Sequence, residues 1–358
     1  MSKLNIIFFS SSYFTNSILE SIYNSKNQNL AEIVSKQLEN LKSKSGFLSE
    51  VWQNDHIINK ILSNAEQYTL DIDLVVSQPD RQNRNKIIQN PTVIKAKEFG
   101  LEVFTPVKIN KEIDKFKELV KDSAIALVAS YGQIISEEVL NIPKYGFVNW
   151  HPSRLPLYRG ATPMQTILFN GETDTALSWI EMSKEMDAGN IILGIDQQIE
   201  NSWTFTDLAS EMAKIGSETW ALVVATKIYE QDLDQKLSVT QVGEPTFTKY
   251  LYKEDSLIDP NNKAASQIYN QYRGFYEFPG TKIYSQYFHQ QLKIVDAENY
   301  EPKNFEIIFE NSEWLQVKEN AKTRTFLKCQ NSSLLQINKV VFENGKRLGF
   351  EGFEFKIN

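Results

Sequence analysis

The feature that most constrains the fold of this chain is a series of short, nearly continuous apolar runs in its N-terminal part. The runs lie at residues 4–9, 72–76, 124–129 and 147–150. A strand that is apolar on both faces is typical of a parallel sheet covered by helices on its two sides. Helical stretches separate the runs, for example residues 91–99, where Gly100 marks the end. This alternation predicts an α/β fold with a doubly wound, mostly parallel sheet.

Such a sheet also indicates where a site should lie, because ligands bind beyond the carboxyl ends of its parallel strands. Two of the predicted strands end in polar segments, at residues 130–132 and 149–151. Residues two apart in an extended chain point to the same side, so we expect Asn149 and His151 to face one pocket. An amide N–H can stabilise an oxyanion, and an imidazole can take or return the proton of an attacking amine. Acyl or formyl transfer needs such a pair.

A carboxylate near this pair is the third candidate. Asp187 follows the strand-like run 176–182, and Gly189 lets the loop bend back toward the strand ends. In that place Asp187 would orient the ring of His151 and raise its basicity. For an isolated Asp-x-Gly, capping or turning a loop is the commoner role.

An insertion separates the first helix from the second predicted strand, at about residues 26–69. A βα connection usually closes within a few residues. Helical spacing is present on both sides of Gly46, at Leu30, Val34, Leu38 and Leu41 before it and at Leu48, Trp52, Ile58 and Leu62 after it. We therefore expect an inserted helical hairpin, which we interpret first as a packing element and alternatively as a partner-binding surface.

The character of the sequence changes after residue 229. The polar stretch 230–245 is typical of an interdomain linker. Beyond it, aromatic and β-branched runs alternate with turn residues, at 282–288, 305–309, 314–318, 324–329, 334–342 and 350–357. Strands of this length predict a small OB-like β-barrel. We thus divide the chain into a catalytic domain at 1–229, a linker at 230–245 and a C-terminal domain at 246–358.

The composition excludes several kinds of site. Cys329 is the only cysteine, so an intramolecular disulfide and a cysteine-built zinc site are ruled out, and three scattered histidines do not suggest a metal centre. The first apolar run is too short for a membrane span or a secretory signal. The net charge of −7 argues against indiscriminate nucleic-acid binding. We expect a cytoplasmic, metal-independent monomer.

Several motifs between residues 149 and 189 point to one family. The chain carries Asn149-x-His151, Ser153-x-Leu155-Pro156, Arg159-Gly160-Ala161-x-Pro163-x-Gln165 and Asp187-x-Gly189. Together they resemble the signature of the formyltetrahydrofolate-dependent formyltransferases. Residues 78–81, 100–106 and 131–135 resemble further landmarks of that family, and 273–280 resembles its Arg-x-x-x-x-x-Pro-Gly element. The segment 159–165 is most similar to that of the methionyl-tRNA formyltransferases.

The resemblance implies a Rossmann-like catalytic sheet and a co-substrate, 10-formyltetrahydrofolate, that is used without a metal. It implies that Asn149 and protonated His151 stabilise the oxyanion, while Asp187 positions His151 and manages the proton of the amine. The implied folate-binding residues are Ser153, Arg154, Leu155, Pro156, Tyr131, Gly132, Gln133 and Ile134. The implied acceptor is initiator methionyl-tRNA, which makes the chain an enzyme of translation initiation.

Some positions depart from the family pattern. The first βα turn is Ser10-Ser11-Ser12, where the family has a Gly-Thr-Pro-like sequence, and Arg154 replaces an apolar residue of the folate loop. The family often has a glycine-rich basic sequence near the acceptor end of tRNA, whereas residues 82–86 contain no glycine. The residues expected to contact the acceptor end here are Arg81, Arg84 and Lys86.

The C-terminal domain contains a second candidate surface for tRNA. Residues 321–350 are basic, with Glu343 as the acidic exception. Alternate residues of a strand share one face, which predicts a basic stripe with an aromatic side chain in it, formed by Lys322, Arg324, Phe326 and Lys328. We expect its three basic residues to contact tRNA, with an ordinary solvated strand face as the alternative.

Other functions fit the same residues. An enzyme that formylates an amino sugar on a nucleotide would use the same three side chains and would need a nucleotide pocket in place of the basic stripe. A catalytically silent RNA-binding relative would use the helical insertion as its surface, but the intact Asn149, His151 and Asp187 argue against it. A folate-dependent transferase of purine synthesis would need no second domain.

Overall fold

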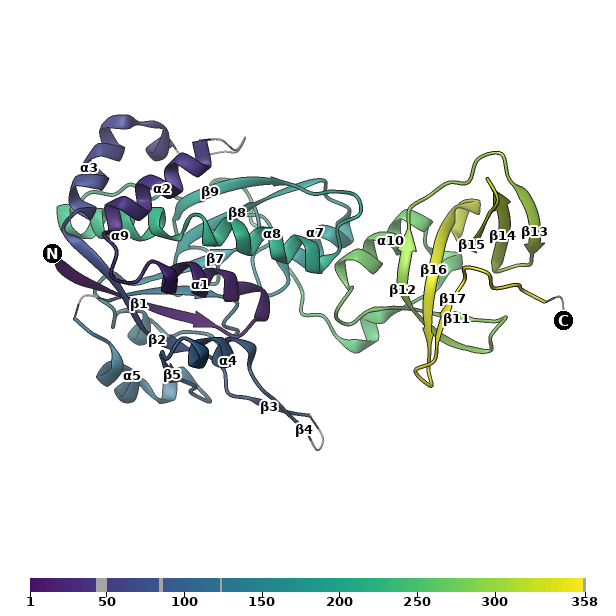
Figure 1. Cartoon of the computed structure of the whole chain (residues 1–358), viewed down its shortest axis with the longest axis horizontal. Helices are drawn as coiled ribbons and strands as arrows, with labels where there is room; N and C mark the ends of the chain where they lie inside the picture. Colours follow the sequence, from purple (N-terminus) through teal and green to yellow (C-terminus); the bar gives the residue numbers. More distant parts are fainter. Residues whose placement is uncertain (43–49, 84–85, 123, 357–358) are drawn as a thin grey trace. The chain divides into compact units, whose positions relative to one another are not determined.

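The computed structural model describes residues 1–42, 50–83, 86–122 and 124–356 (Figure 1). Its contacts divide the chain into two compact units. The first comprises Met1–Ala161, Asp174–Gln198 and Ala209–Phe247, and the second comprises Thr162–Thr173, Ile199–Leu208 and Thr248–Asn358. Two short segments from the N-terminal part of the sequence thus belong to the unit that the C-terminal residues form. The domain limits predicted above stay a prediction.

The first unit is built on a sheet with the strand order β5-β2-β1-β6-β7-β8-β9. These strands are β1 (Ser2–Ser10), β2 (Tyr68–Val76), β5 (Glu102–Phe104), β6 (Ala124–Ala129), β7 (Phe147–His151), β8 (Asp174–Glu181) and β9 (Ile191–Gln198). The strands from β5 to β7 pair in parallel, whereas β8 and β9 are antiparallel to their neighbours. The predicted mostly parallel α/β sheet is confirmed.

Helices cover both faces of this sheet because its strands carry large apolar side chains on both. Phe9 of β1 packs edge-on against Phe116 of α5 (Ile113–Leu119), with ring centroids 5.7 Å apart. From the other face, Trp150 of β7 donates its indole N–H to the main-chain oxygen of Met212 in α8 (Phe205–Ser217) at 3.2 Å. Further helices of this unit are α1 (Asn16–Asn24), α4 (Pro91–Glu98), α6 (Glu137–Leu140) and α9 (Trp220–Leu233).

The insertion contains α2 (Leu30–Lys42) and α3 (Asp55–Ala65), so its predicted helices are present. Both helices pack against α9 (Figure 1). Gln37 of α2 donates to the main-chain oxygen of Ser217 and accepts from the backbone N–H of Ala221, which satisfies the first turn of α9. The predicted turn with Gly46 and Leu48 lies outside the described residues. These contacts fit the interpretation of the insertion as a packing element.

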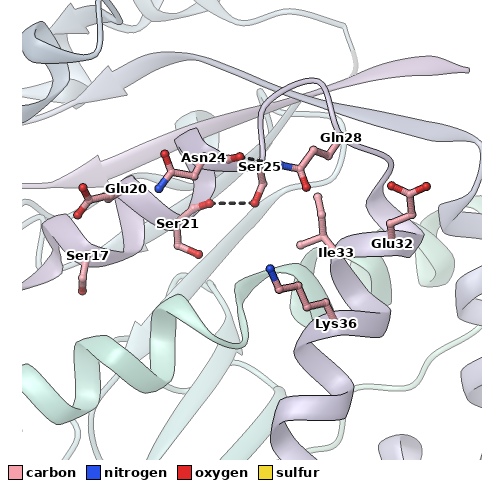
Figure 2. A pocket seen from close by; sticks show the side chains of 9 residues that line it. All are labelled: Ser17, Glu20, Ser21, Asn24, Ser25, Gln28, Glu32, Ile33 and Lys36. Carbon is pink, nitrogen blue, oxygen red and sulfur yellow. Dashed lines mark hydrogen bonds between the residues drawn. The ribbon is translucent and has the colours of Figure 1, made fainter.

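A groove of about 580 Å³ lies between α1 and α2 (Figure 2). Its lining is mostly polar and consists of Ser17, Glu20, Ser21, Asn24, Ser25, Gln28, Glu32, Ile33 and Lys36. Ser25 and Gln28 donate to the main-chain oxygens of Ser21 and Asn24, so part of this polar surface is already paired within the protein. Among the described residues that line it, none is a candidate for chemistry from the sequence.

The second unit is a largely antiparallel sheet with the order β10-β11-β12-β16-β15-β14-β13, to which β17 adds beside β16. The strands are β10 (Leu257–Ile258), β11 (Thr281–Ser285), β12 (Gln290–Glu298), β13 (Glu306–Glu310), β14 (Trp314–Glu319), β15 (Lys322–Lys328), β16 (Leu334–Phe342) and β17 (Arg347–Gly349). Buried aromatic side chains such as Trp314 and Phe350 fill its core. The predicted smaller β domain in the C-terminal part is confirmed.

This unit also contains α7 (Pro163–Asn170) and α10 (Ala265–Gly274), which pack against each other. The helices approach so closely that a Cβ on Gly274 would lie 2.6 Å from the main-chain oxygen of Gln165. Arg273, which the family pattern singled out, is buried and donates to Asn270 at 2.9 Å. Close packing with α10 explains why α7 belongs to the unit formed by the C-terminal residues.

Candidate active site

The candidate catalytic side chains meet at the end of β7. Asn149 and His151 lie two residues apart on this strand, and Asp187 comes from the loop between β8 and β9. The amide of Asn149 donates to Oδ1 of Asp187 at 3.3 Å, and Nδ1 of His151 lies 3.5 Å from Oδ2 of Asp187. The structure therefore brings the three predicted residues together around one carboxylate.

The main chain fixes the second ring nitrogen of His151. Nε2 lies 3.0 Å from the carbonyl oxygen of Tyr158, and because a carbonyl can only accept, Nε2 carries a proton. In the neutral ring the lone pair is then on Nδ1, the nitrogen that faces Asp187. When Nδ1 is protonated as well, both N–H groups face oxygen atoms. Nδ1 is thus the nitrogen placed to accept and return a proton.

The amide of Asn149 retains capacity for a ligand. A carboxamide NH2 group has two N–H donors, and the contact with Asp187 uses one of them. The other can donate to an oxyanion that forms beside the strand end. His151 is 3% exposed, so a charge that develops here is screened less than it would be in bulk water.

Close packing and hydrogen bonds hold the loop that carries Asp187. The backbone of Asp187 has φ = +53°, a left-handed conformation that needs support in a residue other than glycine. The backbone N–H of Gly160 donates to Oδ2 of Asp187 at 2.8 Å. A Cβ on Gly189 would lie 1.7 Å from the main-chain oxygen of Glu181, so this position requires glycine. The Asp-x-Gly motif therefore combines a held carboxylate with a close backbone approach.

Hydrogen bonds within the loop and from β8 hold the predicted folate-binding residues 153–156. The hydroxyl of Ser153 donates to the carbonyl of Leu157 at 2.6 Å. Ser178 of β8 donates to the carbonyl of Ser153 at 2.7 Å and accepts from the backbone N–H of Leu155 at 3.3 Å. The peptide bond between Leu155 and Pro156 is cis. These contacts fix the path of the chain directly after His151.

Arg154 departs from the family pattern, and the structure shows which residues bind its charged side chain. The guanidinium pairs with Asp196 of β9 and with Asp174 of β8, the latter at 2.9 Å, and also donates to the carbonyl of Thr175 at 3.2 Å. Two carboxylates therefore balance the added charge. The side chain ties the loop after β7, which contains the predicted folate-binding residues 153–156, to β8 and β9.

The second predicted folate segment follows β6. Tyr131 is buried, with its ring edge-on to Phe9 at 5.1 Å, and within the described part of the chain its hydroxyl has no hydrogen-bond partner. Burial, together with the charge of Glu112, raises the pKa of the Tyr131 hydroxyl above its usual value. Gln133 accepts from the backbone N–H of Ile109 at 3.0 Å, whereas Ile134 is exposed.

The turn Ser10-Ser11-Ser12 supports this segment. The Ser11 hydroxyl and the Gln78 amide both donate to the main-chain oxygen of Tyr131, at 3.2 Å and 2.7 Å. Ser11 also accepts from the backbone N–H of Gln78 at 3.0 Å. Gly132 has φ = +80°, and a Cβ there would lie 2.5 Å from the Gln78 amide. The serine-rich turn thus contributes side-chain hydrogen bonds that hold the segment after β6.

Gln241 is a site residue that no sequence motif indicated. Its amide donates to the main-chain oxygens of Asp187 at 2.7 Å and of Gly189 at 2.8 Å. Its Oε1 accepts from Arg159, at 2.6 Å from Nη2 and 3.2 Å from Nε. Arg159 belongs to the quoted family motif, but Gln241 lies in the polar stretch predicted to be a linker, where composition carries no signal of a contact.

Arg81 and Lys86, two of the residues expected near the acceptor end of tRNA, lie on a hairpin of β3 (Arg81–Asn83) and β4 (Lys86–Ile88) that extends from the first unit (Figure 1). Arg81 and Lys86 are exposed, as are the apolar side chains of Ile87 and Ile88. Arg84 lies outside the described residues. The structure thus presents two of the three predicted basic side chains at the surface.

The basic stripe of the second unit differs from its prediction in one respect. Phe326 is fully buried in a small apolar cluster, so the prediction of an aromatic side chain on the stripe is wrong. The reason is that the middle of this face of β15, at Phe326, packs into the core, whereas the two ends of the strand lie nearer the surface. Lys322 at one end is exposed.

The other two basic side chains of the stripe have acidic partners. Arg324 pairs with Glu319 at 3.0 Å and lies over the ring of Tyr300, with 4.3 Å between the guanidinium carbon and the ring centroid. Lys328 pairs with Glu310. These pairings reduce the positive charge that the stripe offers to a phosphate backbone.

Comparisons with known proteins agree with this fold. A family model described as formyl transferase matches residues 49–226, and one described as formyl transferase, C-terminal domain, matches residues 250–354. Proteins named methionyl-tRNA formyltransferase are similar to the chain. The protein from Mycoplasmopsis pulmonis is 34% identical over 60% of this chain and 73% of its own length, and that from Carboxydothermus hydrogenoformans is 32% identical over 82% and 90%. The chain belongs to the formyl transferase family.

The predicted resemblance to the methionyl-tRNA formyltransferases is confirmed by these relatives, and the chain is an enzyme of this family. Solved structures share the fold at lower identity. WlaRD, described as a sugar 3N-formyl transferase, has a TM-score of 0.53 at 15% identity and covers 96% of this chain and 99% of its own. A 4-N formyltransferase from Francisella tularensis has a TM-score of 0.53 at 15% identity, with coverage of 80% and 95%.

The described residues contain neither a candidate metal centre nor a helix suited to a membrane. Across 1–42, 50–83, 86–122 and 124–356, no group of three or more His, Cys, Asp and Glu side chains has an arrangement that could hold a metal ion. None of the helices in the same ranges is long and apolar enough to span a bilayer.

Proposed function

We propose that this enzyme transfers the formyl group of 10-formyltetrahydrofolate to the amino group of methionyl-tRNA. The observation that carries the reaction is the convergence of Asn149, His151 and Asp187 at the end of β7. The names of the similar relatives support the acceptor, since they are methionyl-tRNA formyltransferases. Monomeric state and a cytoplasmic location stay predictions from the sequence.

In the proposed reaction, the nitrogen of the methionyl amine attacks the formyl carbon, and a tetrahedral oxyanion forms. The second N–H of Asn149 donates to this oxyanion, and Nδ1 of His151 accepts the proton of the amine, so that the resulting imidazolium adds positive charge near the oxyanion. The C–N bond to the folate then breaks. One proton leaves the amine and one reaches the folate nitrogen, so the balance is a single proton transfer. Asp187 beside Nδ1 stabilises the imidazolium through which this proton passes.

The folate donor would lie against the two loops that follow β6 and β7. Ser153, Leu155 and Pro156 shape one side, and the segment from Tyr131 to Ile134 shapes the other. Tyr131 supports this segment from the core, where its buried ring packs edge-on against Phe9. Arg154 takes part by fixing the loop, because Asp174 and Asp196 bind its guanidinium.

The acceptor would meet basic side chains outside the catalytic residues. Arg81 and Lys86 on the β3–β4 hairpin, together with Arg84, are proposed to contact phosphates near the acceptor end. Lys322 is the exposed charge of the C-terminal stripe, whereas Arg324 and Lys328 contribute less because each is paired. Phosphate contacts of this kind make binding depend steeply on salt.

A direct comparison of acceptors tests this proposal. The pure protein is incubated with 10-formyltetrahydrofolate and either methionyl-tRNA or an amino-sugar nucleotide, and chromatography identifies the formylated product. We expect formylmethionyl-tRNA. Formylation of the amino-sugar nucleotide with untouched methionyl-tRNA would replace the proposed acceptor by the alternative considered from the sequence. Formylation of neither would overturn the proposal.

A further inference from the structure

Residues 235–247 follow α9 and overlap the segment 230–245 that the sequence predicts to be a linker, yet hydrogen bonds tie them to both loops of the candidate site. We call this segment the strap. Its first anchor is Glu230 of α9, whose carboxylate accepts from the backbone N–H groups of Leu237 at 2.7 Å and Ser238 at 2.6 Å. Lys227 pairs with the same carboxylate at 2.8 Å. The strap thus starts from a buried helix.

The middle of the strap binds the loop that carries Asp187. Val239 and Ile191 exchange backbone hydrogen bonds of 2.7 Å and 2.9 Å at the point where β9 begins. Two residues further on, the Gln241 amide donates to the main-chain oxygens of Asp187 and Gly189. These two carbonyls flank Ala188, so a single side chain spans the bend of the loop.

The end of the strap binds the loop that orients His151. The carbonyl of Thr246 accepts from the backbone N–H of Arg159 at 2.8 Å, and its hydroxyl accepts from the backbone N–H of Tyr158 at 2.8 Å. The carbonyl of Tyr158 is the group that fixes Nε2 of His151. The Arg159 side chain returns to Gln241, which links the two loops through the strap.

We propose that Gln241 is a positioning residue for formyl transfer, which holds Asp187 against His151 and Asn149 through the main chain of its loop. Asp187 needs such a restraint because its backbone lies at φ = +53° and its carboxylate must serve three groups at once. Arg159 anchors Gln241 by binding its oxygen, so that both N–H groups of the amide face the loop. This inference rests on the proposed role of Asp187 in formyl transfer.

Two substitutions of Gln241 separate its contacts. Gln241→Met keeps the size of the side chain and removes all its hydrogen bonds. Gln241→Glu keeps the oxygen that accepts from Arg159 and loses the donors to Asp187 and Gly189. Gln235→Met is the matched control on the same strap, since Gln235 accepts from Tyr229 and contacts neither loop in the hydrogen bonds that the structure gives it.

The assay measures kcat, the KM for 10-formyltetrahydrofolate and the melting temperature, in the wild type and in an Asp187→Asn background. A displacement of about 1 Å at a catalytic group costs up to roughly 100-fold in rate. We expect both Gln241 variants to lose about 10- to 100-fold in kcat with the folate KM within about twofold of the wild type. Gln235→Met should keep the wild-type kcat. In the Asp187→Asn background, Gln241→Met should cause no further loss, because there is no carboxylate left to position.

Two results would overturn the inference. One is a Gln241→Met or Gln241→Glu enzyme with at least half of the wild-type kcat. The other is an equal loss of kcat from Gln241→Met in both backgrounds, which would mean that Gln241 acts elsewhere. Failure of the proposed function looks different, because the wild type would then form no formylmethionyl-tRNA, whereas failure of the proposed role of Asp187 would leave Asp187→Asn as fast as the wild type. If Gln241→Met does not fold, Gln241→Glu provides the same comparison.

Discussion

The packing of Gly189 predicts a large loss of activity from a single methyl group. A Cβ at this position would lie 1.7 Å from the main-chain oxygen of Glu181, whereas an ordinary contact begins at 3.4 Å. The loop and the end of β8 must therefore separate by about 1.7 Å in Gly189→Ala. Because Asp187 lies two residues away, most of that displacement reaches its carboxylate.

The expected cost follows from the geometry of the site. Asp187 lies 3.3 Å from the Asn149 amide and 3.5 Å from Nδ1 of His151, so a shift of more than 1 Å breaks both contacts. A misplacement of this size costs roughly 100-fold in kcat, which corresponds to about 2.7 kcal/mol of transition-state stabilisation. The KM for the folate should change little, since its proposed loops do not move.

Single-turnover formylation of methionyl-tRNA by Gly189→Ala measures this loss, with circular dichroism to confirm the fold. Gly349→Ala is the matched control. It adds the same methyl group, but the nearest atom is 4.0 Å away, so the activity should not change. A Gly189→Ala enzyme within threefold of the wild-type rate would refute the claim that this close approach positions the carboxylate.

Further predictions concern the catalytic pair, the tRNA surface and pH. His151→Ala should slow turnover by roughly 10²–10⁴-fold and Asn149→Ala by roughly 10²–10³-fold, and both variants should fold. A His151→Ala enzyme that keeps more than about a tenth of wild-type turnover would exclude the proposed role of the imidazole. Removing the charges of Lys322, Arg324 and Lys328 should raise the KM for methionyl-tRNA and flatten its salt dependence, while kcat stays unchanged. Lys322→Ala alone should give most of this effect, because Arg324 and Lys328 are paired with acidic residues. If the KM of the triple variant equals that of the wild type at two salt concentrations, the stripe does not contact tRNA. Burial would raise the pKa of Glu230, but Lys227 and the N–H groups of the strap lower it below its usual value. Its contribution to stability is therefore full above the unfolded-state value of about 4.3 and is lost as the pH falls through the lowered folded-state pKa. Glu230→Gln should cost about 1–3 kcal/mol in the free energy of unfolding at pH 7, with a difference from the wild type that shrinks below about pH 4, and an equal difference at both pH values would contradict this assignment.

The sequence alone predicts the strands of the first sheet and the side on which their residues lie, because both follow a regular spacing. Continuous apolar runs identified the parallel strands because such strands are buried on both faces. The spacing of Asn149 and His151 placed both side chains on one side of β7 because strand residues alternate. Asp187 needed the family motif, since a loop residue carries no periodic signal of what it contacts.

Long-range contacts explain what could not be predicted. The sequence shows the charge of Arg154 but not its partners, because Asp174 and Asp196, which bind it, are distant in sequence. Phe326 alternates correctly with its neighbours on β15, but only the packing of the second unit shows that its side is core. Gln241 lies in a polar stretch, and a polar composition does not distinguish an unattached linker from a segment that binds the loops of the site.

The central claim is that one carboxylate organises formyl transfer to methionyl-tRNA. Its most direct test is the single-turnover rate of Asp187→Asn, measured with saturating 10-formyltetrahydrofolate and methionyl-tRNA and compared with the wild type. The asparagine keeps the size of the side chain and removes the charge that faces Nδ1 of His151. We expect formylmethionyl-tRNA to form at least about 100-fold more slowly in the variant, with folded protein and intact folate binding. Equal rates in the two proteins would contradict the account.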